Sequence, residues 1–199
     1  SAQIRGIHVD FDAVFINTFD GIFVYDKRSS RISEIKTGDE VFQLAQKVIK
    51  DDRYLYFSTL SKGLVRYDII KKEVTVFGSD SFVKSNSVYA MDADHRYFVA
   101  GSLDPGVAIR RKSDDSVIYL NRENGMLHEN NVKNLQIDGR FLWIGVHTKG
   151  IYRYDFETGQ MKFMNWGLPF PSAMNKRERE IWVGTTGNGI RIFDREKET

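Results

Sequence analysis

The sequence predicts an all-β fold built from β-propeller blades, and three observations support this prediction. A short pattern recurs five times: a hydrophobic or aromatic pair, a polar turn, a glycine, and a strand that usually ends in aspartate. Its second aromatic position, held by Phe15, Tyr56, Phe98, Trp143 and Trp182, gives spacings of 41, 42, 45 and 39 residues. Hydrophobic residues within each copy alternate with a period of two, as in β-strands. A strand-rich repeat of about forty residues is typical of propeller blades.

Four strands are expected in each copy, and we name them A to D in chain order. Strand B carries the marker aromatic residue, strand C follows the glycine, and strand D is shorter. Strand A has apolar residues three positions apart, as in Val132 and Leu135. Residues three apart lie on opposite faces of a regular strand, so we expect strand A to be squeezed between two neighbouring blades. The predicted D strands are residues 32–35, 74–77, 117–120 and 161–164.

The repeat predicts that residues 1–199 form a single array of blades. The predicted blades are residues 4–36, 42–78, 85–120, 130–165 and 171–199, and the last is incomplete because only residues 195–199 follow Asp194. We therefore expect the chain to be a segment of a larger propeller. A closed ring of five blades is the alternative.

Repeated glycines and aspartates are predicted to serve the blade itself. The glycine before strand C is expected to adopt a backbone conformation that a Cβ disfavours, and the aspartate after it to cap its own turn. The aspartate pairs Asp10/Asp12 and Asp92/Asp94 lack the glycine and distal glutamate of a calcium loop. We interpret them as turn formers and expect no metal site and no cofactor.

Composition excludes several classes of partner. The 29 basic and 27 acidic residues leave a formal charge of +2, and they are spread along the chain instead of forming a basic stripe. Nucleic acid is therefore not expected as a partner. No apolar run is long enough to cross a bilayer, so we expect no membrane contact by this segment. The chain has no cysteine, which excludes disulfides and thiolate sites.

The order of these pieces resembles the two-component regulator propeller repeat. The best match runs from Gly125 to Asp155, with Leu142-Trp143-Ile144-Gly145 and Gly150-Ile151-Tyr152-Arg153-Tyr154-Asp155 at its centre. The resemblance implies the periplasmic, non-catalytic sensor region of a bacterial hybrid two-component histidine kinase. It also implies a small-molecule or oligosaccharide ligand, such as a glycan or its breakdown product. The other expected partners are the remaining blades of the parent protein and, through self-association, a second copy.

Ligand recognition is expected on one rim of the blades. Successive loops of an antiparallel meander alternate between two rims, so the B–C loops and the D–A crossovers share one of them. Residues that bind a ligand should differ between blades, whereas scaffold residues repeat. Aromatic rings beside amide and carboxylate groups suit sugars, which combine apolar CH faces with hydroxyls. The candidate ligand-binding residues are Phe19, Lys62, Asp104, His128, Asn130, His147, Lys149, Trp166 and Asn188.

Other interpretations stay open at this point. Trp166 could cover a blade edge, and His147 and Lys149 could be solvated turn residues. A protein-interaction scaffold is one alternative function, and a propeller hydrolase or lyase is another. The enzyme alternative is disfavoured because the chain has four histidines and no serine in a Gly-x-Ser-x-Gly elbow. No catalytic residue is therefore predicted.

Overall fold

The computed structural model confirms the all-β prediction. It describes residues 3–18, 21–35 and 45–197, and within these ranges the regular elements are all β-strands. The chain divides into two compact units, Ser1–Tyr89 and Ala90–Thr199, which we describe one at a time. Their combination into a single array, as the sequence predicts, stays a prediction.

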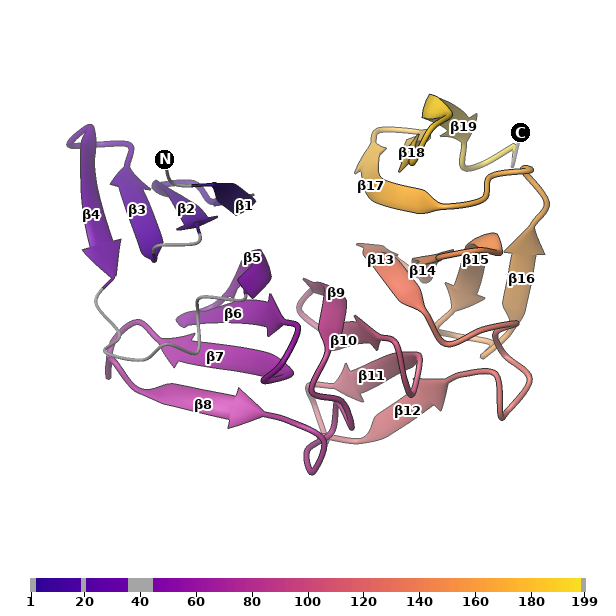
Figure 1. Ribbon diagram of the computed structural model, residues 1–199, viewed down its shortest axis with the longest axis horizontal. Coiled ribbons are helices and arrows are strands. Elements are labelled where there is room, and N and C mark those ends of the chain that lie inside the picture. Colours follow the sequence, from indigo (N-terminus) through magenta and orange to yellow (C-terminus); the bar gives the residue numbers. More distant parts are fainter. Residues whose placement is uncertain (1–2, 19–20, 36–44, 198–199) are drawn as a thin grey trace. The chain divides into compact units, whose positions relative to one another are not determined.

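Unit 1 contains two four-stranded antiparallel sheets, blades 1 and 2, whose strands follow chain order (Figure 1). Blade 1 consists of β1 (Ile4–Val9), β2 (Ala13–Thr18), β3 (Ile22–Asp26) and β4 (Arg31–Ile35), and blade 2 of β5 (Ala45–Asp51), β6 (Tyr54–Thr59), β7 (Leu64–Asp68) and β8 (Val74–Phe77). The two sheets pack through a core that includes Phe15, Ile22, Val48, Phe57 and Val65.

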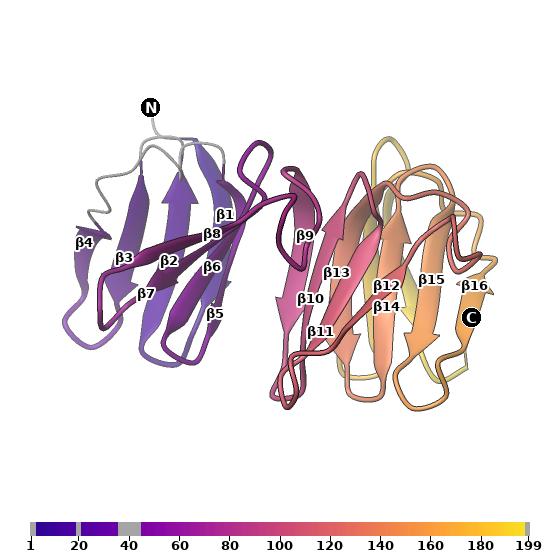
Figure 2. The ribbon, with the colours of Figure 1, turned by 90° about the horizontal axis from the view of Figure 1, so that it is seen from below.

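Unit 2 contains three antiparallel sheets, blades 3 to 5, apart from the first two residues of blade 3, Val88 and Tyr89, and Figure 2 shows neighbouring strands of a sheet running in opposite directions. Blade 3 consists of β9 (Val88–Ala93), β10 (Tyr97–Ser102), β11 (Val107–Arg111) and β12 (Val117–Leu120), and blade 4 of β13 (Val132–Asp138), β14 (Phe141–Val146), β15 (Gly150–Asp155) and β16 (Met161–Met164). Blade 5 has three strands among the described residues, β17 (Pro171–Arg177), β18 (Glu180–Thr185) and β19 (Gly189–Asp194). One core lies between blades 3 and 4, and a second between blades 4 and 5.

The expectation for the faces of strand A is wrong, because each A strand with a defined register contains a β-bulge. In blade 4 the register shifts between Val132 and Asn134, so that Val132 lies opposite Val146 and Leu135 lies opposite Ile144. Val146 and Ile144 are two residues apart and share a face, so Val132 and Leu135 share that face as well. Both belong to the core between blades 3 and 4. The same shift occurs in β1, β5 and β17.

The marker aromatic residues occupy equivalent positions in strand B. Phe15, Tyr56, Phe98 and Trp143 are buried, whereas Trp182 is half-buried. In blade 4 the next blade covers the face that carries Trp143. Nearby positions follow the same pattern, since Ile151 is fully buried and its equivalent in blade 5, Ile190, is 65% exposed.

The turn predictions for glycine and aspartate are confirmed. The glycine before strand C has a positive φ in each blade, for example +76° at Gly63 and +97° at Gly150. The carboxylate that ends strand C accepts hydrogen bonds from the next turn, as Asp68 does from the N–H groups of Ile70 and Lys71. Blade 3 is the exception, because Arg111 stands at this position and Asp114 instead caps the turn through Ser116.

Candidate ligand-binding rim

The B–C loops and the D–A crossovers lie side by side within each unit, and we call this edge the crossover rim. Backbone hydrogen bonds join them directly. The N–H of His147 donates to the carbonyl of Asn131 at 2.9 Å, and the N–H of Phe170 donates to the carbonyl of His147 at 2.8 Å. In unit 1 the N–H of Gly63 donates to the carbonyl of Asn86. The loops chosen from the sequence therefore form continuous strips of surface.

Seven of the nine candidate residues lie on the crossover rim of unit 2. Lys62 belongs to unit 1, where its side chain is exposed. Phe19 lies outside the described residues. The seven in unit 2 are Asp104, His128, Asn130, His147, Lys149, Trp166 and Asn188.

His128 lies at the centre of the strongest polar cluster on this rim. Its Nδ1 shares a hydrogen bond with the hydroxyl of Tyr152, and its ring packs edge-on against Phe163 with the centroids 5.8 Å apart. Burial raises the pKa of Tyr152, and the negative charge of Glu129 raises it further, so the phenol stays protonated at neutral pH. His128 itself is exposed, and Phe163 is 41% exposed. An imidazole held in a fixed orientation beside an aromatic ring is thus presented to solvent.

Glu129 extends this cluster into the B–C loop of blade 4. Its two carboxylate oxygens accept hydrogen bonds from the N–H and the hydroxyl of Thr148, at 2.6 and 2.7 Å. Sequence reasoning placed Glu129 and Thr148 in the loops of this rim without selecting them as candidates, and it missed Tyr152 and Phe163. The first two are neighbours in sequence of His128 and His147, which was the available signal. Tyr152 and Phe163 lie in strands C and D, where an aromatic residue looks like core.

A second cluster joins blade 3 to the following crossover. The side-chain amide of Asn130 donates to Asp104 at 3.2 Å and to Glu123 at 3.0 Å. The hydrogen bond from Asn130 lowers the pKa of Glu123. The structure thus brings together two of the predicted residues, Asp104 and Asn130. Across the described ranges, no group of three or more His, Cys, Asp or Glu side chains could hold a metal ion.

The remaining candidates have different surroundings. His147 packs its ring against Phe170 with the centroids 5.3 Å apart, and Phe170 is 40% exposed. Lys149 and Asn188 have exposed side chains. Trp166 stacks on Phe193 at 4.0 Å with an interplanar angle of 3°, and on Trp143 at 5.7 Å. It therefore packs against the core between blades 4 and 5, and its role in ligand binding stays a prediction.

The opposite edge, which we call the turn rim, contains the A–B and C–D turns. In each blade the two turns are joined by a backbone hydrogen bond, such as that from Phe156 to the carbonyl of Arg140 at 3.0 Å. Two recesses of about 520 Å³ each lie on the turn rim of unit 2, one between blades 4 and 5 and one on blade 5. Sequence reasoning placed no candidate residue in either of them.

Asp138 links blades 4 and 5 at the turn rim and predicts a pH dependence of stability. Burial raises the pKa of its carboxyl, but hydrogen bonds from Arg195 and Lys176 lower it more, so the pKa lies below its usual value of 3.8. A carboxylate with a depressed folded-state pKa stabilises the fold above its unfolded pKa, and this contribution is lost as the pH falls through the folded pKa. We expect Asp138→Asn to cost about 1–3 kcal/mol at pH 7. The cost should shrink below about pH 4, near the unfolded pKa of aspartate.

Urea denaturation of the whole chain between pH 7 and pH 2.5 measures this effect as a change in the free energy of unfolding of unit 2. Glu178→Gln in an exposed turn of blade 5 is the matched control and should leave the profile unchanged. A pH profile that is identical for Asp138→Asn and the unmodified chain would contradict the linkage.

No protein-family model matches the sequence, and no curated protein matches it. Solved structures do match the fold. The extracellular domain of a protein described as a hybrid two-component system from B. thetaiotaomicron is 15% identical with a TM-score of 0.79, covering 98% of this chain and 29% of that chain. The extracellular domain of a protein described as a one-component system from the same organism is 19% identical with a TM-score of 0.77, covering 96% and 26%.

A computationally designed protein is also similar, at 13% identity with a TM-score of 0.64, covering 96% of this chain and 58% of that chain. The two natural extracellular domains are much longer than this chain, which spans less than a third of the length of each. At these identities the likeness concerns the fold. It confirms the propeller-blade fold, which this chain shares with extracellular domains of the kind that the repeat resemblance implies.

Proposed function

We propose that this chain is part of the extracytoplasmic sensor region of a two-component receptor and that it binds a glycan or a glycan breakdown product without catalysing a reaction. One observation supports this proposal most: the extracellular domain of a hybrid two-component system has a similar fold, and the match covers 98% of this chain. In a Gram-negative bacterium such a region is periplasmic. Within the described residues no helix is long and apolar enough to span a membrane.

The chemistry of the crossover rim supports a carbohydrate ligand. Sugars need both hydrogen-bonding groups and apolar faces, and around His128 the rim offers Glu129, Thr148 and the exposed ring of Phe163. Most of these groups are already held by neighbouring side chains, so little rotamer freedom is lost when a ligand binds. The site is therefore suited to recognition at low entropic cost.

The Nδ1 atom of His128 is hydrogen-bonded to Tyr152, which leaves Nε2 as the ring nitrogen that can reach a ligand. The carboxylate of Glu129 is held by Thr148. We assign these residues to ligand contact, an assignment that turnover of an oligosaccharide would contradict.

The outer faces of blades 1 and 5 support the proposal that further blades of the parent protein pack against this segment. On blade 1, Ile7 is 55% exposed, Val9 64% and Ile32 67%. These three residues share one face of the sheet through the registers of β1 to β4. On blade 5, Ile190 is 65% exposed although its equivalent in blade 4 is fully buried. Apolar sheet faces of this kind match the faces that adjacent blades bury elsewhere in the chain.

Calorimetric titration with oligosaccharides selected from a glycan library tests the proposed site. We expect His128→Ala to weaken binding about tenfold, equivalent to about 1.4 kcal/mol, because it removes one hydrogen-bonding group. His95→Ala is the matched control, since His95 is an exposed histidine of blade 3 on the turn rim. Equal affinities for both variants would place the ligand elsewhere, and turnover of the oligosaccharide would contradict the non-catalytic assignment.

A further inference from the structure

The chain contains two asparagine–glycine pairs, Asn124–Gly125 and Asn188–Gly189. The two residues of such a pair can react with each other, because the backbone nitrogen of the glycine can attack the side-chain carbonyl carbon of the asparagine and close a five-membered ring. Glycine permits this approach since it has no Cβ beside its nitrogen. Asparagine is among the thermolabile residues of proteins. The two pairs are identical, so their surroundings decide how readily each one reacts.

Hydrogen bonds hold Asn124 in an unreactive arrangement in the crossover between blades 3 and 4. Its side-chain amide donates to the carbonyl of Tyr119 at 2.7 Å, and its side-chain oxygen accepts from the N–H of Asn121 at 3.1 Å. The N–H of Gly125, the group that would attack, donates to the carbonyl of Arg122 at 3.1 Å. Ring closure at this position therefore requires several hydrogen bonds to break first.

Asn188 has none of these restraints in the B–C loop of blade 5. Its side chain is exposed, and no hydrogen bond holds it within the part of the chain that the structure describes. The loop is closed instead by the hydroxyl of Thr185, which donates to the carbonyl of Gly189 at 3.0 Å. The side chain of Asn188 can thus rotate until its carbonyl carbon faces the nitrogen of Gly189.

The backbone at Gly189 is also uncovered. At the equivalent position in blade 4, a Cβ on Gly150 would lie 2.9 Å from the carbonyl oxygen of Leu168, and a Cβ on Gly63 in blade 2 would lie 2.3 Å from that of Phe77. At Gly189 no described heavy atom beyond the adjacent residues lies within 4 Å of this place. Neighbouring backbone therefore packs against the loop glycine in blades 2 and 4, and the loop of blade 5 lacks this cover among the described residues.

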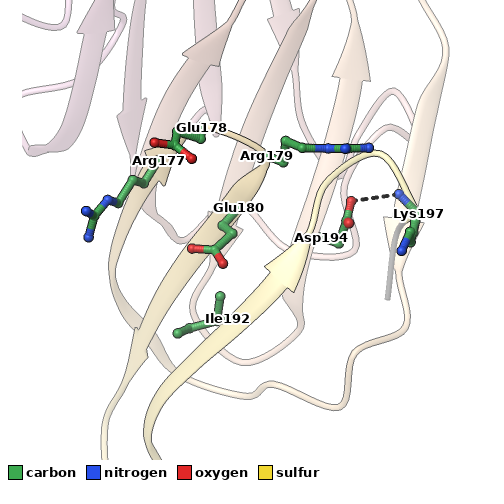
Figure 3. Close-up of a pocket in the computed structure, with 7 residues that line it drawn as sticks. All are labelled: Arg177, Glu178, Arg179, Glu180, Ile192, Asp194 and Lys197. Atoms are coloured by element: carbon green, nitrogen blue, oxygen red, sulfur yellow. Dashed lines mark hydrogen bonds between the residues drawn. The ribbon is translucent and has the colours of Figure 1, made fainter.

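Figure 3 shows the other end of β19, where the chain enters the C–D turn of blade 5. There the N–H of Lys197 donates to the carboxylate of Asp194 at 3.0 Å. This turn belongs to the turn rim, so the last described residues lie at the opposite edge of the blade from Asn188. They do not shield the loop.

We propose that Asn188 is a site of spontaneous deamidation on the crossover rim. The nitrogen of Gly189 bonds to the Cγ atom of Asn188, the bond from Cγ to Nδ2 breaks, and the side-chain nitrogen leaves as ammonia with the proton of the Gly189 amide. Water then opens the cyclic imide at either of its two carbonyl carbons. One product is aspartate, and the other is isoaspartate, in which the backbone runs through the side-chain carbon.

Either product changes the chemistry of the rim at this place. A neutral amide that donates and accepts hydrogen bonds becomes a carboxylate, which only accepts them when it is ionised. Isoaspartate also lengthens the backbone by one carbon directly before β19, where Gly189 lies opposite Thr185 in the sheet. The proposal does not depend on the sensing function proposed above, because the reaction needs only water.

Peptide mapping by mass spectrometry tests the proposal. The folded chain is incubated in buffered water enriched in oxygen-18, which labels the new carboxylate, and the peptides that contain each asparagine are quantified over time. We expect Asn188 to convert at least about tenfold faster than Asn124, because only Asn124 must first break hydrogen bonds. Isoaspartate should form at Asn188 together with aspartate, since it arises only from the imide.

Two controls separate the surroundings from the residues themselves. In urea the hydrogen bonds around Asn124 are lost, so its rate of conversion should rise close to that of Asn188. Asn188→Gln should stop the conversion at this position and leave that of Asn124 unchanged, because the longer side chain cannot close a five-membered ring. The proposal would be overturned by no conversion at Asn188, by an equal or higher rate at Asn124 in the folded chain, by a product without isoaspartate, or by a difference that persists in urea.

Discussion

Replacing Gly63 by alanine is expected to destabilise unit 1 by about 2–4 kcal/mol. Gly63 has a φ of +76°, and an added Cβ would lie 2.3 Å from the carbonyl oxygen of Phe77 and 2.6 Å from that of Ser85. Both atoms belong to the backbone, so the strand or the crossover must move. Such a shift would also strain the hydrogen bonds of Gly63 with Asn86 and Thr59. Hydrogen exchange of the amides in β6 to β8 measures the loss, because it reports on unit 1 directly.

Gly125→Ala is the matched control. Its φ is +77°, but no neighbouring heavy atom lies within 4 Å of the place that a Cβ would occupy. This variant should therefore cost only the strain of a left-handed backbone, about 1–2 kcal/mol. Equal losses in the two variants, each measured in its own unit, would show that close approach of the backbone adds nothing at Gly63.

Replacing Trp166 by alanine is expected to destabilise unit 2 by about 2–4 kcal/mol, somewhat less than for a fully buried tryptophan. The ring stacks on Phe193 and on Trp143 and packs against the core between blades 4 and 5. Urea denaturation followed by far-ultraviolet circular dichroism measures the loss, provided that hydrogen exchange shows which unit unfolds.

Trp166→Phe keeps an aromatic ring at this position and should cost less than about 1.5 kcal/mol. If Trp166 acted mainly as a platform for ligand stacking, the alanine variant would lose affinity and keep its stability. That result would restore the role that the sequence predicts for this residue and contradict the packing role.

The repeat made the strands predictable because every blade has the same local pattern of residues. The alternation of apolar residues, the glycine before strand C and the aspartate after it each act within a few residues of chain. Predicted D strands such as 74–77 and 161–164 accordingly coincide with β8 and β16. The faces of strand A were not predictable in the same way. A single bulged residue between Val132 and Asn134 moves Leu135 to the other face, and no residue in the sequence marks it.

The sequence predicted which loops form the crossover rim better than it predicted which side chains contact one another there. The rule that recognition residues differ between blades selected His128 and His147, and the structure places both on the crossover rim beside aromatic rings. It also selected Trp166, because a tryptophan in a crossover resembles an exposed ligand platform. Its burial depends on Phe193, which lies 27 residues later and in another blade. Tyr152 escaped notice for the opposite reason, since it belongs to a strand and reaches the rim through its hydroxyl and one side of its ring.

The sequence alone determined the blades: their number, their order, their strands and the turns that close them, because these depend on short-range periodicity and backbone preferences. The tertiary structure decided what lies between the blades. The bond between Asn130 and Asp104 and the recess that joins Arg153 to Arg195 bring together residues 26 and 42 positions apart. Such contacts depend on bulges, packing and side-chain rotamers of two sheets at once, and a pattern that repeats every forty residues carries no information about them.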